Sequence, residues 1–130
     1  MRFAKTVYLV AGIYGVVIVT PMFFMEAKIG RDLPPAINHP EYFYGFLGVT
    51  FAWQLLFLVL AMDPLRYRPM MIPAIVEKVS YGIALILLHL QHRLPEKVFQ
   101  VGSVDWAFVV LFVAAYLATR RDPWKRHPTA

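Results

Sequence analysis

Two stretches of the chain carry no charged residue and are each long enough to cross a lipid bilayer. They are residues 6–25 and 42–62. An α-helix needs about 20 apolar residues to cross ~30 Å of hydrocarbon. Both runs are apolar on every face, whereas the strands of a membrane β-barrel alternate apolar and polar positions. The pattern therefore predicts membrane-spanning helices.

Composition supports the same class of protein. Hydrophobic residues make up 59% of the 130 residues, and charged residues only 16%, whereas soluble domains are about 25% charged. A chain this apolar cannot stay solvated as a disordered segment. The lack of cysteine excludes disulfide scaffolds, thiolate zinc sites and cysteine nucleophiles. At this length we expect one domain, covering residues 1–130.

Two further stretches predict two more helices. The third helix opens near Pro73, which suits a first helical turn, although it contains two charged residues. The uncharged part of the fourth stretch, residues 106–119, is too short to cross a bilayer, so the helix must include residues on either side of it. Ser103 is its expected N-cap. We therefore expect an all-α, integral membrane four-helix bundle with helices at about 6–25, 42–62, 70–90 and 104–120.

Prolines and glycines divide the connections. Pro21 is expected to kink or end the first helix. Residues 26–40 hold three prolines among polar residues and predict a non-helical loop, while residues 95–100 predict a short interfacial helix ended by Gly102. Trp124, in the basic C-terminal tail, is the expected membrane-interface anchor.

Lysine and arginine residues are unevenly divided between the two sides of the predicted bundle. Eight lie on the side of both termini and four on the other side. The positive-inside rule then predicts cytoplasmic N- and C-termini in a bacterial inner membrane. The net charge of +5 is explained by topology and does not imply nucleic acid, although the tail suits anionic lipid headgroups. Two basic residues precede the first apolar run, as in a signal peptide. The run is longer than the hydrophobic region of a signal peptide and lacks an A-x-A cleavage site, so we expect this helix to be retained and not cleaved off.

Small residues on three of the predicted helices favour close helix packing. We expect them to hold the four helices together, with contacts between two copies of the chain as the alternative. These residues are Ala11 and Gly15, then Gly45, Gly48 and Ala52, and finally Ala114 and Ala118.

Two ionisable residues inside the third helix are the main functional candidates. Charged groups are costly in a bilayer, so Glu77 and Lys78 require partners or a role. Gln54 lies at a similar depth on the second helix with Trp53 beside it, and Tyr81 lies one turn from both charges. With the rim residues Asp63, Arg66 and Tyr67, they predict a polar cavity that opens to the cytoplasm.

A purely structural role for these charges is the competing interpretation. Glu77 would then pair with Arg66 or hydrogen-bond to Gln54 and Tyr81, while the Lys78 ammonium would reach the inner surface. The predicted ligand-binding set is Glu77, Lys78, Tyr81, Gln54, Trp53 and Arg66.

Other ionisable residues carry weaker signals. Asp105 stands in the first turn of the fourth helix, where the helix dipole favours a carboxylate, so we expect a capping role. His89 and His92 have a spacing compatible with one metal, but zinc normally takes three or four protein ligands. The sequence predicts neither a metal site nor a catalytic residue.

A segment in the middle of the chain resembles the DoxX-like group of small four-span bacterial membrane proteins. The resemblance rests on Tyr44-Gly45-Phe46-Leu47-Gly48, on Asp63-Pro64-Leu65-Arg66-Tyr67-Arg68, and on Glu77 beyond them. It implies a four-helix bundle, and it implies a link to quinone-dependent oxidoreductase systems, to which some members belong. It supplies no catalytic residue.

From these features we expect an accessory or hydrophobic-ligand-binding component and not a stand-alone enzyme. Membrane lipids, a quinone or other hydrophobic ligand and a membrane-protein partner are the expected partners, and the sequence names no cofactor. One alternative is a sterol-isomerase-like or sigma-2-like protein, in which Glu77 would face a closed chamber of roughly 300 Å³ or more. The other is a structural subunit of a membrane complex.

Overall fold

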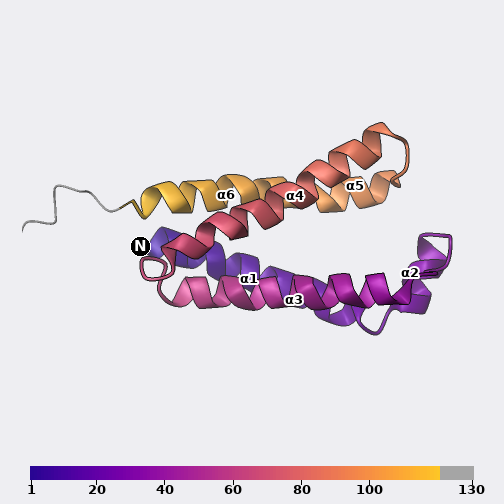
Figure 1. Cartoon of the computed structure of the whole chain (residues 1–130), viewed down its shortest axis with the longest axis horizontal. Coiled ribbons are helices and arrows are strands. Elements are labelled where there is room, and N and C mark those ends of the chain that lie inside the picture. Colours follow the sequence, from indigo (N-terminus) through magenta and orange to yellow (C-terminus); the bar gives the residue numbers. More distant parts are fainter. Residues whose placement is uncertain (121–130) are drawn as a thin grey trace, which may run out of the picture.

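The computed structural model describes residues 1–120, which are helical throughout apart from short connections (Figure 1). Within this range there is no strand. The prediction of an all-α chain with four helical segments long and apolar enough to cross a membrane is confirmed. The predicted anchor Trp124 lies outside the described residues. The elements are α1 (Arg2–Met22), α2 (Glu26–Asp32), α3 (Pro40–Met62), a 3₁₀ turn η1 (Arg68–Met70), α4 (Met71–Leu90), α5 (Glu96–Gly102) and α6 (Val104–Ala118).

The first connection is partly helical, so the prediction of a non-helical loop is wrong there. Helix α1 ends one residue after Pro21, as expected, and α2 follows. An ion pair between Lys28 and Asp32, one turn apart, supports α2. The hydroxyl of Tyr44 on α3 donates a hydrogen bond to the Glu26 carboxylate at 2.8 Å, which ties α2 to α3.

The fourth apolar helical segment is longer at its start than the predicted 104–120. Helices α5 and α6 together run from Glu96 to Ala118 with a single break. Ser103 occupies the N-cap position of α6, as predicted, but its backbone is helical and its hydroxyl donates to the Phe99 carbonyl at 2.6 Å. The predicted short helix at 95–100 is therefore present, but it extends the fourth segment.

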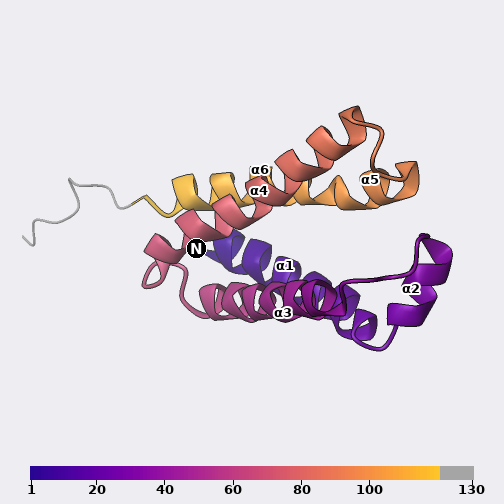
Figure 2. The same ribbon diagram turned by 45° about the vertical axis from the view of Figure 1, so that its right-hand side comes forward.

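The helices form two hairpins that meet at one end and diverge at the other. Helix α1 packs along α3 and α4 packs along α6, with α1 also contacting α6. Figures 1 and 2 show the pairs close together near the N-terminus and apart near α2 and α5. The closed end holds the core, where the Phe112 ring lies 4.5 Å from that of Tyr8 and 5.0 Å from that of Phe57. All three side chains are buried.

The small residues of α1 pack within the fold, but those of α3 do not. Ala11 is buried, and a Cβ added to Gly15 would lie 1.8 Å from Oε1 of Gln54 on α3. A Cβ on Gly45 or Gly48 would meet nothing within 4 Å. The predicted role in close packing is therefore confirmed for the small residues of α1 and wrong for Gly45 and Gly48 of α3. On α6 the predicted Ala114 and Ala118 are not buried, and Ala115 is the buried alanine of the core instead.

Candidate functional site

Helix α4 directs one lysine into the interior of the fold. Lys78 lies seven residues after the start of α4, or roughly 10 Å along the helix, and is only 7% exposed. Its ammonium lies 3.3 Å from Oδ1 of Asp105 on α6 and 3.6 Å from Oε2 of Glu77. The side chain does not reach a surface, so the prediction that it extends to the inner surface is wrong.

Asp105 reaches Lys78 because it lies well inside the fourth apolar helical segment, Glu96–Ala118. It is nine residues after Glu96, or roughly 13 Å from the start of the segment. Its carboxylate accepts a hydrogen bond from the Lys78 ammonium, and no side chain caps the start of α6. Asp105 lies in the first turn of α6, as predicted, but it makes no capping hydrogen bond among the described residues and pairs with Lys78 instead, because α5 extends the segment beyond it.

Aromatic rings complete the surroundings of the Lys78 ammonium. The nitrogen lies 5.5 Å from the ring centroid of Phe57 and 5.8 Å from that of Phe108. A cation within about 6 Å of an aromatic face is attracted by the ring quadrupole. The charge therefore lies between two carboxylates and the aromatic core.

The three charged groups do not balance. Glu77 and Asp105 supply two carboxylates and Lys78 one ammonium, so the fully ionised set carries one excess negative charge. Oε2 of Glu77 is buried and has no hydrogen-bond partner among the described residues. A buried charge that is only partly compensated is costly. The site therefore favours a group that brings a proton or a positive charge.

A groove of about 880 Å³ contains these charges and extends between the hairpins toward the diverging end. Its walls come from α1 and α3 on one side and from α4 and α5 on the other. Its lining includes Tyr14, Gly15, Phe46, Val49, Thr50, Trp53, Gln54, Val76, Glu77, Lys78, Tyr81, Val101 and Asp105. It contains five of the six predicted site residues, because α3 and α4 diverge around them.

The groove opens at the end opposite to the one expected. Asp63, Arg66 and Tyr67 do not line it. Arg66 is exposed at the closed end, with its guanidinium carbon 5.5 Å above the Tyr67 ring. The predicted pairing of Glu77 with Arg66 and the predicted opening beside Arg66 are therefore wrong, because the aromatic core closes that end.

The uncharged polar residues of the predicted site lie beside the groove without bonding to Glu77. Gln54 is 2% exposed, and its amide donates to the Thr50 carbonyl at 3.0 Å. Trp53 and Tyr81 are half-buried and line the groove. The predicted hydrogen bonds from Gln54 and Tyr81 to Glu77 are absent from residues 1–120, which leaves that carboxylate with Lys78 as its near partner.

The open end of the groove carries charges of both signs. Asp32 of α2 and Lys97 of α5 lie there on opposite sides. A hydrogen bond from Lys28 holds the pKa of the Asp32 carboxyl below its ordinary value. Asp32 is therefore ionised at neutral pH, and the entrance is more polar than the walls.

The two histidines considered for metal binding take different positions. The His89 ring stacks on Phe99 with 4.0 Å between centroids, and its Nδ1 lies 3.7 Å from a carboxylate oxygen of Glu96. His92 follows the end of α4 with φ at 55°. Among residues 1–120 no three histidine, aspartate or glutamate side chains are grouped as a metal would need.

Asp105 is the site residue that sequence reasoning missed. The sequence feature that points to Asp105 is the short uncharged stretch at 106–119. A helix that crosses a membrane here must begin well before residue 106, so Asp105 lies inside it and not at its end. The count of two carboxylates for one lysine follows only when this residue is included.

Compared with known proteins, the chain matches no family model, no curated protein and no solved structure.

Proposed function

We propose that the chain is an integral protein of a bacterial inner membrane and binds a hydrophobic molecule of the quinone or lipid class in the groove. Membrane insertion is supported by four helices of sufficient length and by large apolar side chains exposed on all of them. The uneven distribution of lysine and arginine supports cytoplasmic termini. With that orientation the groove opens toward the outer half of the bilayer.

The observation that carries the proposal is the combination of apolar walls with a charged inner end. Ligand sites are typically clefts of about 300–1,000 Å³ with a few polar groups that fix orientation, and the groove has about 880 Å³. Val49, Val76 and Val101 line its sides, while Glu77 lies in the half nearer the closed end. An amphipathic molecule fits with its apolar part along the walls and its polar head at Glu77.

The charge balance selects the kind of head group. Lys78 is already held by two carboxylates, whereas the carboxylates lack a second cation or donor. A head group that donates a hydrogen bond, such as a hydroquinone hydroxyl, stabilises Glu77, and a group that only accepts does not. We therefore expect the reduced form of a quinone to bind more tightly than the oxidised form.

The two comparisons made from the sequence fit this proposal unequally. A DoxX-like relationship implies a four-helix bundle and a link to quinone systems, and both accord with the proposed ligand. A sterol-isomerase-like or sigma-2-like site needs a closed chamber, whereas this groove is open between the diverging hairpins. We propose a binding component in preference to an enzyme.

A matched pair of probes tests the proposal. The purified full-length chain in lipid nanodiscs is titrated with a decyl hydroquinone and with the corresponding decyl benzoquinone, and binding is followed by quenching of tryptophan fluorescence. One hydrogen bond to a charged group contributes about 1.5–3 kcal/mol. We therefore expect the hydroquinone to bind about 10-fold to 100-fold more tightly.

Two variants identify the site of binding. Glu77→Gln removes the excess negative charge, so it abolishes the preference for the hydroquinone. Glu41→Gln changes an exposed carboxylate that does not line the groove, so it leaves the preference intact. Equal binding of both probes, or a preference that survives in Glu77→Gln, refutes the assignment.

A further inference from the structure

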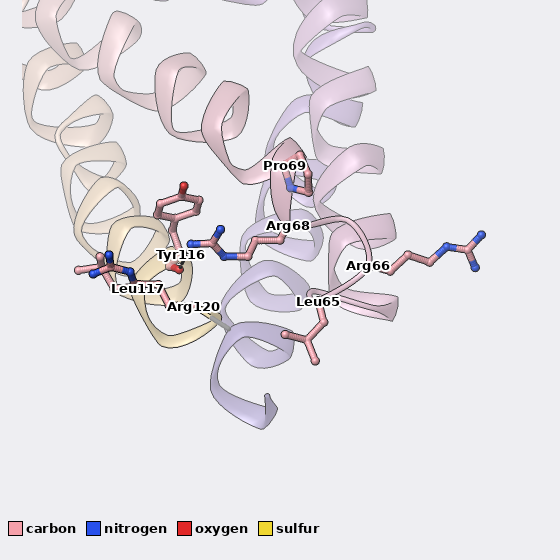
Figure 3. Close-up of a pocket in the computed structure, with 7 residues that line it drawn as sticks. All are labelled: Leu65, Arg66, Arg68, Pro69, Tyr116, Leu117 and Arg120. Atoms are coloured by element: carbon pink, nitrogen blue, oxygen red, sulfur yellow. Dashed lines mark hydrogen bonds between the residues drawn. The ribbon is translucent and has the colours of Figure 1, made fainter. Parts of the chain in front are cut away.

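A second pocket lies at the closed end of the bundle, remote from the groove. It has a volume of about 720 Å³ and lies between the α3–α4 connection and the end of α6 (Figure 3). None of its lining residues also lines the groove. The lining residues are Leu65, Arg66, Arg68, Pro69, Tyr116, Leu117 and Arg120.

The guanidinium of Arg68 is held in a fixed position in this pocket. Its Nε donates to Oγ1 of Thr119 at 3.3 Å, and one terminal nitrogen donates to the Tyr116 carbonyl at 3.1 Å. Its central carbon lies 3.9 Å from the centroid of the Tyr116 ring. Thr119 is fully buried, so the anchor is part of the core. Arginine has five N–H donors, and those not used here remain available for a ligand.

The pocket is positively charged, and none of its described lining residues is acidic. Figure 3 shows Arg120 on the same side as the Arg68 guanidinium, whereas Arg66 extends away from both. The nearby Asp63 accepts a hydrogen bond from the backbone N–H of Arg66 and does not line the pocket. Arg68 and Arg120 therefore form the basic side of the pocket.

We propose that this pocket binds the phosphate headgroup of an anionic membrane phospholipid. Arginine matches phosphate oxygens with parallel N–H donors, and Arg68 is already oriented by its contacts with α6. Leu117 lies beside the arginines, and Val113 and Val110 continue the same exposed apolar face of α6 away from the pocket. An acyl chain along this face and a headgroup at the arginines account for both features. The inference shares with the proposed function only the placement in a membrane.

Native mass spectrometry of the detergent-purified full-length chain tests the inference. The protein is incubated with equal amounts of phosphatidylglycerol and phosphatidylcholine that carry identical acyl chains, and the lipid retained is measured. A basic residue at a membrane surface contributes about 1 kcal/mol toward an anionic lipid. We expect the wild type to prefer phosphatidylglycerol, and Arg120→Gln to weaken its retention about fivefold.

A series of variants separates headgroup binding from general charge. Arg68→Gln is expected to weaken retention further. Arg120→Gln serves if Arg68→Gln fails to fold, because the Arg120 side chain is exposed and forms no hydrogen bond or ion pair with residues 1–120. Arg66→Gln removes one positive charge from the same pocket, but the Arg66 side chain extends away from Arg68 and Arg120. This variant is therefore expected to retain the preference for phosphatidylglycerol. Equal retention of both lipids, or equal loss in Arg66→Gln, overturns the inference.

Inorganic phosphate distinguishes the two sources of the ligand. The assignment to a lipid is overturned if millimolar inorganic phosphate displaces phosphatidylglycerol from the protein and also binds to the lipid-free protein with the same affinity. The groove provides an independent readout, because Glu77→Gln retains phosphatidylglycerol and Arg120→Gln retains the hydroquinone preference. Failure of one proposal is therefore distinguishable from failure of the other.

Discussion

The contact between Gly15 and Gln54 gives the sharpest test of the hairpin geometry. An alanine Cβ at position 15 would lie 1.8 Å from Oε1, 2.2 Å from Cδ and 2.6 Å from Cγ of Gln54. Non-bonded carbon atoms prefer separations of about 3.5–4.0 Å. The glutamine side chain must therefore move away as a whole, and Gly15→Ala is expected to destabilise the fold.

The magnitude follows from what Gln54 loses when it moves. Forcing an extra methyl group into a packed interior costs about 1–3 kcal/mol, and Gln54 is only 2% exposed. Displacement also breaks its hydrogen bond to the Thr50 carbonyl, worth about 0.5–1.5 kcal/mol. We expect Gly15→Ala to lower the free energy of unfolding by about 2–4 kcal/mol.

A double-mutant cycle attributes this loss to the contact. Unfolding of the full-length chain in detergent micelles is followed by far-UV circular dichroism during titration with sodium dodecyl sulfate. In a Gln54→Ala background the obstacle is gone, so adding Gly15→Ala is expected to cost less than about 1 kcal/mol. An equal cost of Gly15→Ala in both backgrounds would refute the proposed packing.

Gly48→Ala is the matched control on α3. A Cβ there meets nothing within 4 Å. We therefore expect Gly48→Ala to lower the free energy of unfolding by no more than about 0.5 kcal/mol. A large loss in Gly48→Ala would show that the α3 surface is covered by something other than lipid or detergent, such as a second copy of the chain.

Three further perturbations test other parts of the structure. Lys78→Met leaves two carboxylates without their ammonium and is expected to cost about 3–5 kcal/mol in the same titration. Neutralising both carboxylates as well, with Glu77→Gln and Asp105→Leu, should recover most of that loss. Gly82→Ala places a Cβ 2.6 Å from the Trp106 ring, so it should destabilise the α4–α6 hairpin by about 1–3 kcal/mol and shift tryptophan emission; unchanged emission would contradict this contact. Asp32 has a lowered pKa in the fold, so its ion pair stabilises α2 above the ordinary aspartate range near pH ~4 and is lost as the pH falls through the lowered value. The protection factors of the α2 amides, that is, their exchange rates relative to the intrinsic rate at each pH, should therefore fall on acidification in the wild type, and Asp32→Asn should remove that fall.

Several features of the site were predictable because they depend on local sequence. Glu77 and Lys78 are exceptions within an apolar helix, and helical geometry places Tyr81 one turn from them. Gln54 was matched to Glu77 by depth alone, and both line the groove. Helix length and periodicity are properties of a single segment, so they can be derived without knowing how segments pack.

The partners of these residues were not predictable in the same way. The sequence favours Arg66 as a partner of Glu77 because it places both in the cytoplasmic half. In the structure the rings of Tyr8, Phe57 and Phe112 fill the closed end, and Arg66 is exposed outside the groove. Asp105 became a partner only because α5 extends the fourth segment. Both errors concern relations between helices, which depend on how side chains from distant segments interlock.

The amino-acid sequence by itself determined the helical class, the four helical segments long and apolar enough to cross a membrane, and the presence of two charges within one of them. These follow from hydropathy and helical length, which act within each segment. Only the tertiary structure decided that the hairpins diverge, that the groove opens away from the termini, and that Lys78 lies between two carboxylates. The physical reason is that helices meeting in an apolar environment gain little from hydrophobicity. Their arrangement depends on shape and charge contacts, such as Gly15 against Gln54 and Lys78 against Asp105.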